Sequence, residues 1–323
     1  MEPDAGKRIE STGGHPLIAI LGPTASGKSS LALKLAQRIG GEIVNCDSMQ
    51  MIRHLDIGTA KPSQAEMKLV PHHLYNVIDL DEFYSAGVYM EDARRVCSEV
   101  TARGKIPLVV GGTGLYLRAL LKGIFPGPGK EPGLRERLNE ISRRKGAEFL
   151  HRMLARKDSD SAARIQVNDQ VRIVRALEVN LVTGGSISEL QKEQLPLAGF
   201  AVVKIGLNPP REELYDRINR RVERMFDAGF LKETERLLLA GFSQNSKGFE
   251  ALGYRHAVAV IQGELSLEES IELTQRETRR YSKRQMTWFR KEEDVHWISL
   301  PGEASAAEPE ALRILARELP DGV

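Results

Sequence analysis

The feature that most constrains the fold is the segment GPTASGKS at Gly22 to Ser29. A short aliphatic run, PLIAIL at Pro16 to Leu21, precedes it, and the helical pattern LALKLAQRIGG follows it. The segment matches G-x-x-x-x-G-K-[ST], in which a glycine loop between a strand and a helix turns backbone N–H groups toward a phosphate. Because the flanking strand and helix supply the required context, the sequence predicts an α/β domain that binds a di- or triphosphate.

Each part of this phosphate-binding loop has a predicted role. Lys28 supplies a mobile cation, and the Ser29 hydroxyl is a candidate ligand for Mg²⁺. The glycines let the backbone approach the anion closely. The predicted diphosphate- or nucleotide-binding residues are Gly22, Pro23, Thr24, Ala25, Ser26, Gly27, Lys28 and Ser29.

Two further strands are predicted, EIVNC at Glu42 to Cys46 and KIPLVV at Lys105 to Val110. Strands that alternate with helices indicate a doubly wound parallel sheet, whose functional loops lie at the carboxyl ends of the strands. No carboxylate follows KIPLVV directly, which disfavours a hydrolase that holds Mg²⁺ with an acid at that position. Asp47 follows the other strand, where it is either a general base facing the phosphate loop or a cap of a turn.

The loop GGTGLY at Gly111 to Tyr116 follows the strand KIPLVV. Its hydroxyl residue, Thr113, is positioned to donate to a leaving oxygen. The alternative is that the glycines provide only ordinary turn geometry.

The chain is expected to form two domains. After Gly123 a Pro- and Gly-rich linker is followed by helical periodicity without a comparable strand, and AVVKIGL at Ala201 to Leu207 then resumes the strand pattern. We therefore predict a discontinuous parallel-sheet core, residues 1–122 and 200–323, with a mostly helical insertion at 123–199.

Charge distribution indicates a polyanionic partner, although the formal net charge of +2 does not. Residues 271–291 contain seven basic and two acidic residues, and residues 123–157 contain nine basic and four acidic residues. Arg276, Arg280 and Lys283 share a helical face, with Tyr281, Trp288 and Phe289 interleaved, a composition suited to phosphates and stacked bases. A solvated helix face packed by its aromatic residues is the alternative.

Several classes of protein are disfavoured. The two cysteines, Cys46 and Cys97, offer no disulfide framework and no CxxC zinc pair. His72 and His73 lack the i, i+4 spacing of a helical metal pair, so structural hydrogen bonds are expected for them. No apolar run approaches the ~20 residues of a membrane span, and residues 1–15 lack a signal-peptide core, so we expect a cytoplasmic protein without a membrane role.

Together the motifs resemble those of the bacterial tRNA dimethylallyltransferases, also called tRNA isopentenyltransferases. The resemblance is carried by GPTASGKS, the Asp-Ser pair after the second strand, DIGTAKP, GGTGLY, NDQVRIVRALEV, GYR and KRQMTWFR, in this order between Leu17 and Trp297. It implies transfer of a dimethylallyl group from dimethylallyl diphosphate to N6 of adenosine 37, in tRNAs that read codons beginning with U. Diphosphate leaves, and Mg²⁺ assists.

The resemblance also implies roles for individual residues. Asp47 is the general base, and Thr113 contacts the departing diphosphate. The helical insertion grips the tRNA anticodon stem-loop, and no obligate protein partner is indicated. Including the basic stripe, the expected tRNA-binding residues are Asp47, Ser48, Met49, Gln50, Arg135, Gln170, Val171, Arg172, Ile173, Val174, Arg280 and Lys283.

Two other functions use the same loop. A small-molecule kinase would bind ATP there, but it has little use for two basic helical segments. A nucleotide-gated RNA-binding protein would use the loop as a switch, but a switch needs no base beside the phosphate. ATP is expected to occupy the loop only weakly, without appreciable hydrolysis.

Overall fold

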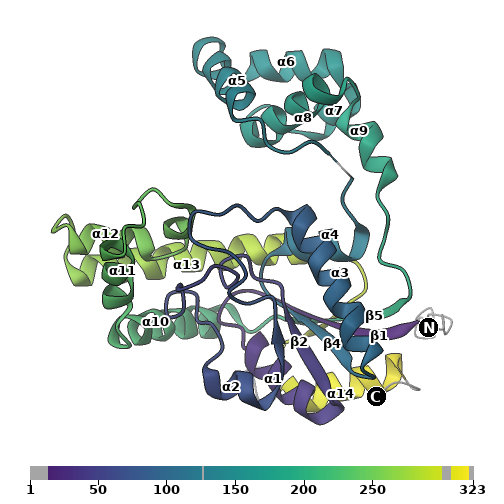
Figure 1. Ribbon diagram of the computed structural model, residues 1–323, viewed down its shortest axis with the longest axis vertical. Helices are drawn as coiled ribbons and strands as arrows, with labels where there is room; N and C mark the ends of the chain where they lie inside the picture. The colour runs from purple at the N-terminus through teal and green to yellow at the C-terminus, as the bar shows by residue number, and fades with distance from the viewer. Residues whose placement is uncertain (1–13, 126, 300–306, 320–323) are drawn as a thin grey trace. The chain divides into compact units, whose positions relative to one another are not determined.

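The computed structural model describes residues 14–125, 127–299 and 307–319 (Figure 1). The chain divides into two units, one formed by residues 1–120 and 197–323 and the other by residues 121–196. The second unit starts at residue 121, two residues before the predicted start of the insertion. It ends at residue 196, three residues before the predicted end.

The first unit is built on a six-stranded, fully parallel sheet with the order β3-β2-β4-β1-β5-β6. β1 is central, so the phosphate-binding loop that follows it emerges in the middle of the carboxyl edge of the sheet. Four strands correspond to predicted ones within a residue or two. The strands are β1 (His15–Leu21), β2 (Gly41–Asn45), β3 (His72–His73), β4 (Ile106–Val110), β5 (Phe200–Leu207) and β6 (Val295–Ile298).

Helices cover both faces of this sheet. The apolar sides of α1 and α14 pack on one face, together with side chains such as Ile18, Ile20 and Ile205, while α3 lies against the other (Figure 1). Near the C-terminus, the residues from Ala307 to Glu318 form the helix α14. The helices here are α1 (Lys28–Ile39), α2 (Gln64–Leu69), α3 (Ala86–Ala102), α4 (Gly114–Lys122) and α14 (Ala307–Glu318).

A second group of helices lies beside the sheet, and their apolar residues form a separate core. Phe230, Phe249 and Tyr254 are fully buried in it, and the loop after β2 contributes Ile52 and Leu55. This packing fixes that loop relative to the helices. The helices are α10 (Arg211–Asp227), α11 (Phe230–Leu239), α12 (Tyr254–Ile261) and α13 (Leu267–Phe289), with a 3₁₀ turn at Lys247–Glu250.

The second unit is all-helical in its described residues and has its own core. Leu150, Leu154 and Ile173 are fully buried there. Its helices are α5 (Pro132–Lys145), α6 (Ala147–Lys157), α7 (Ser159–Arg164), α8 (Gln170–Thr183) and α9 (Ile187–Leu190), followed by a 3₁₀ turn at Gln191–Glu193.

Candidate active site

The phosphate-binding loop has the backbone geometry that its glycines permit. Gly27 is left-handed, with φ of 94°, and forms the N-cap of α1, while Gly22 has φ of 144°. A Cβ at Gly22 would lie 2.7 Å from the carbonyl oxygen of Leu207. Both glycines are therefore required by conformation or space, and α1 directs its N-terminus into the loop.

Lys28 is the first residue of α1, and its side chain folds back over the loop. Its Nζ donates to the carbonyl oxygen of Pro23 at 2.7 Å. Burial of the ammonium and, to a smaller extent, the charge of nearby Arg221 lower the pKa of Lys28 to about 8, while the Asp47 charge opposes this shift. Among the described residues no carboxylate forms an ion pair with Lys28, so its ammonium is available to bind an anionic ligand.

Asp47 follows β2, and one of its two carboxylate oxygens is already hydrogen-bonded. Its Oδ1 accepts from the backbone N–H of Met49 at 3.0 Å, while its own N–H donates to Oδ1 of Asn45 at 2.9 Å. The other oxygen, Oδ2, has no hydrogen-bond partner among the described residues. Asp47 therefore caps a turn and also presents a free oxygen, so the two sequence interpretations are compatible.

The glycine-rich loop after β4 is shaped by close approach of neighbouring groups. A Cβ at Gly111 would lie 2.1 Å from the backbone of Cys46, one at Gly112 would lie 2.2 Å from Nε2 of Gln285, and one at Gly114 would lie 2.2 Å from the Trp288 ring. None of these three glycines has a positive φ. Packing against Cys46, which follows β2, and against α13 explains these glycines, rather than flexibility or turn geometry.

Thr113 connects this loop to the one after β2. Its hydroxyl accepts from the backbone N–H of Ser48 at 3.0 Å and lies 3.4 Å from the Ser48 hydroxyl, while its N–H donates to the carbonyl of Cys46. The hydroxyl thus contacts the segment that carries Asp47. A contact to a diphosphate stays a prediction.

Two side chains that the sequence analysis did not single out complete the site. Gln285 of α13 accepts from Thr24 N–H at 2.8 Å and donates to the Gly112 carbonyl at 2.9 Å, so it joins the loops after β1 and β4. Arg221 of α10 donates to the Thr24 hydroxyl at 3.0 Å. Gln285 belongs to the segment KRQMTWFR, so the sequence contained a signal for it. Arg221 is one of several arginines on an amphipathic helix, and no sequence pattern distinguishes it from the others.

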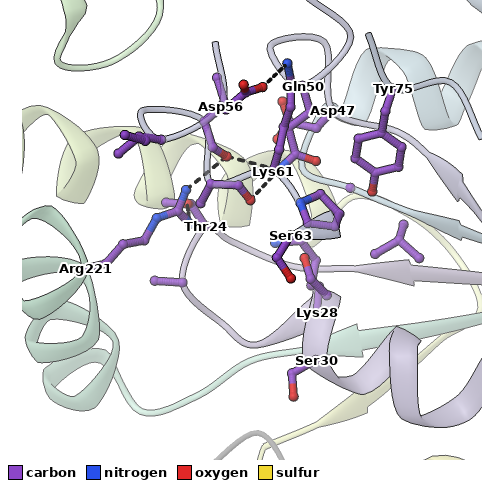
Figure 2. A pocket seen from close by; sticks show the side chains of 18 of the residues that line it. Thr24, Lys28, Ser30, Asp47, Gln50, Asp56, Lys61, Ser63, Tyr75 and Arg221 are labelled. Carbon is purple, nitrogen blue, oxygen red and sulfur yellow. Dashed lines mark hydrogen bonds and ion pairs between the residues drawn. The ribbon is translucent and has the colours of Figure 1, made fainter. Parts of the chain in front are cut away.

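These elements surround one open cavity of about 870 Å³. Figure 2 shows Lys28, Asp47 and Arg221 around it, with Thr24 at the guanidinium end of the arginine side chain. The same cavity is therefore lined by basic and acidic side chains from the carboxyl edge of the sheet and by a basic side chain from α10. Others that line it include Ala25, Gly27, Ser29, Gln50, Lys61, Tyr75 and Gln285.

The expected tRNA-binding residues after Asp47 lie at the same edge. Ser48, Met49 and Gln50 are half-buried, and Gln50 donates to the carbonyls of Thr59 and Ala60 at 3.0 and 3.1 Å. The amide of Gln50 is thus already engaged in holding a neighbouring loop.

In the second unit the expected tRNA-binding residues divide into two groups. Val171 and Arg172 are exposed and Gln170 is half-buried, at the start of α8. The side chains of Ile173 and Val174 are buried in the core of this unit, which assigns them to packing rather than to an RNA surface.

Arg135 of the same unit is engaged by a buried carboxylate. It donates to both oxygens of Glu178, at 2.7 and 2.8 Å, and the Glu178 side chain is fully buried. Hydrogen bonds from Arg135, Arg175 and the Glu131 N–H oppose the effect of burial and lower the pKa of Glu178 to about 2. The guanidinium of Arg135 therefore has a structural partner, and its contact with RNA stays a prediction.

The basic stripe lies on α13. Arg276, Arg280 and Lys283 are exposed, whereas Phe289 is buried and cannot stack on a base. Trp288 is half-buried under the Arg118 guanidinium, 4.5 Å from its ring centroid. The charges of the predicted surface are thus accessible, but its aromatic component is largely used in packing.

The two histidines have hydrogen-bonding roles, as expected. His73 lies 2.7 Å from the buried Glu42 carboxylate, and His72 lies 2.7 Å from the Val70 carbonyl. Within the described residues no cluster of three or more His, Cys, Asp or Glu side chains could hold a metal ion, and no helix is both long and apolar enough to cross a bilayer.

The chain matches two family models, IPP transferase over residues 50–292 and isopentenyl transferase over residues 15–79. A tRNA dimethylallyltransferase of Koribacter versatilis is 47% identical over 300 residues, covering 93% of this chain and 97% of that protein. One of Geobacter sulfurreducens is 49% identical over 286 residues, covering 88% and 92%.

Solved structures agree with these matches. The full-length tRNA isopentenylpyrophosphate transferase of Bacillus halodurans is 35% identical with a TM-score of 0.70, covering 95% of this chain and 98% of that one. A eukaryotic dimethylallyltransferase acting on tRNA is 28% identical with a TM-score of 0.77, covering 94% and 78%. These two structures share most of this chain's fold.

Proposed function

The chain belongs to the tRNA dimethylallyltransferase family, and we propose that the cavity at the carboxyl edge of its sheet is where the transfer occurs. The protein is a prenyltransferase that moves a dimethylallyl group from dimethylallyl diphosphate to N6 of adenosine 37 of tRNA. The observation that carries the assignment to this cavity is the shared exposure of Lys28, Asp47 and Arg221 to one space.

The phosphate-binding loop receives the diphosphate of the donor. Lys28 leaves the Pro23 carbonyl for the phosphate, and the backbone N–H groups at the start of α1 add their partial positive charge. Arg221 of α10, which contacts Thr24 of the same loop, offers a second cation. As the C–O bond breaks, negative charge grows on the departing diphosphate, and these groups stabilise it.

Asp47 acts on the acceptor. The exocyclic amine of adenine is a weak nucleophile because its lone pair is delocalised into the ring, so it must be aligned with the allylic carbon and must lose a proton. The free Oδ2 of Asp47 takes that proton, while Oδ1 keeps the turn in place. Adenosine 37 reaches this carboxylate only after leaving the anticodon-loop stack, which costs a few kcal/mol.

Mg²⁺ fits this site as an ion that arrives with its substrate. Ser29 is exposed and lines the cavity, and no carboxylate cluster among the described residues forms a protein cage for a cation. Mg²⁺ commonly binds through substrate phosphates, waters and one or two protein oxygens, and here Ser29 would supply such an oxygen. When bound, the ion neutralises charge on the diphosphate.

The test of the assignment uses purified protein, dimethylallyl diphosphate, Mg²⁺ and unmodified tRNA. Digestion and mass spectrometry of the nucleosides should show a dimethylallyl-sized increase on adenosine. A matched tRNA with guanosine at position 37 should remain unmodified. Transfer of phosphate from ATP to a small molecule, without prenylation, would instead revive the kinase alternative, which the relatives do not favour.

We expect tRNA affinity to fall steeply with rising salt, because exposed cations of α13 and of the second unit replace counterions on the RNA. Affinity for dimethylallyl diphosphate should change much less. Reversing Arg280 and Lys283 to Glu should weaken tRNA binding and flatten the slope of log affinity against log salt, measured by filter binding.

The matched control for this experiment reverses Arg38 and Lys105, two exposed cations at the end of α1 and just before β4. This control makes the same change in net charge but should leave the slope unaltered. If the Arg280 and Lys283 reversal destabilises the fold without altering the slope, or if both double variants shift the slope equally, α13 is not the RNA surface.

A further inference from the structure

Two sequence motifs have no part in the chemistry described above, and the structure brings them together. DIGTAKP covers residues 56–62 in the loop after β2, and GYR covers residues 253–255 at the start of α12. Glu233 of α11 lies between them. It was not singled out from the sequence, where it is one of many glutamates on helices.

The Glu233 carboxylate accepts hydrogen bonds from both motifs. Its Oε2 accepts from the backbone N–H groups of Asp56 and Ile57, at 3.0 and 2.8 Å. Its Oε1 accepts from the N–H of Gly58 at 3.3 Å and from the Tyr254 hydroxyl at 2.6 Å. A single anion therefore binds three consecutive backbone donors, and bonds of this kind to a charged acceptor are stronger than neutral ones.

Packing reinforces the same junction. A Cβ at Gly58 would lie 2.4 Å from the Tyr254 ring and 2.5 Å from the Phe230 ring. Both rings are fully buried, with their centroids 4.7 Å apart in an edge-to-face arrangement. The loop can approach α12 this closely only with glycine at position 58, so the motif residue and the aromatic pair are fitted to one another.

The loop that Glu233 holds forms one wall of the cavity, although Glu233 itself does not line it. Thr59, Ala60 and Lys61 are all part of this wall. The Thr59 carbonyl accepts from Arg221 at 3.4 Å, and that guanidinium also contacts Thr24 of the phosphate-binding loop. Displacement of the wall would therefore release one of the two contacts that orient Arg221.

We propose that Glu233, supported by Tyr254, is a positioning residue for the donor diphosphate. It acts through the loop at residues 56–61 by fixing the wall from which Arg221 is oriented. This inference rests on the proposed function, since it assumes that the diphosphate occupies this cavity. It predicts a defect in donor binding that exceeds any defect in tRNA binding or in the chemical step.

The experiment compares Glu233→Ala, Glu233→Gln and Tyr254→Phe with Glu235→Gln, an exposed carboxylate on the same helix. At saturating tRNA, Glu233→Ala should raise the donor KM about tenfold with kcat reduced less than about threefold. Glu233→Gln retains one acceptor oxygen and should be intermediate, and Tyr254→Phe, which loses one bond, should raise KM about threefold. Glu235→Gln should match the wild type.

Donor affinity is also measured by calorimetry with dimethylallyl diphosphate alone, at a temperature where circular dichroism shows every variant folded. If Glu233→Ala does not fold, the Gln and Phe variants carry the test. Unchanged donor affinity in the folded Glu233 variants would overturn the inference. Decreases in kcat and in tRNA affinity as large as the increase in donor KM would also overturn it. A wild type that binds the donor without transferring it would overturn the proposed function and leave the Glu233 comparison intact.

Discussion

Replacing Asp47 with Asn should lower the single-turnover rate of dimethylallyl transfer by about 10² to 10⁴, the usual contribution of a positioned general base. The asparagine oxygen can still accept from the Met49 N–H, so the turn should persist and the fold should be unchanged. Binding of tRNA and of dimethylallyl diphosphate should remain nearly normal. Rapid-quench transfer assays and separate binding measurements would show this division between binding and chemistry.

The Asp47 experiment needs two comparisons. Asp81→Asn, at an exposed carboxylate elsewhere in the chain, makes the same chemical change and should have no effect. A series of Mg²⁺ concentrations distinguishes a base from a metal ligand, because a lost ligand would be rescued by excess Mg²⁺ whereas a lost base would not. A near-normal rate for Asp47→Asn at any Mg²⁺ concentration would exclude Asp47 as the general base.

The parallel sheet was predictable because its central strands are buried on both faces and so appear as short aliphatic runs. β3 was not, since His72–His73 is too short to show any periodicity and is identified only by its pairing with Ile43 and Val44. The phosphate-binding loop was predictable because its glycines satisfy local backbone requirements. Local requirements are the part of a structure that a single sequence records most directly.

The rest of the site depends on contacts between segments far apart in the chain. Gln285 reaches Thr24 across 261 positions, and Glu233 reaches Asp56 across 177. No spacing rule connects such residues. The same limitation explains Ile173 and Val174, whose helical segment matches a family motif while their side chains face a core that only the folded helices define.

The pH dependence of donor capture should report the state of Lys28. Burial lowers the pKa of Lys28 to about 8 in the free protein, and a bound diphosphate adds negative charge that raises it. Above that pH, binding of the donor is therefore accompanied by uptake of a proton by Lys28. The ratio kcat/KM for the donor should be nearly constant just below pH ~8 and fall by up to about tenfold per pH unit above it. Tyr75, which also lines the cavity, does not interfere, because burial raises the pKa of its hydroxyl.

Lys28→Met tests the assignment of that titration, because methionine retains much of the side-chain length and removes the charge. Loss of one charged donor to a developing oxyanion should lower kcat/KM for the donor by about 10² to 10³ at pH 7. The decline above pH ~8 should disappear, since no ammonium remains to lose its proton. Affinity for tRNA, measured in the absence of donor, should be unchanged. If the variant keeps the wild-type pH profile, another group titrates there, and Lys28 does not supply the cation that receives the diphosphate.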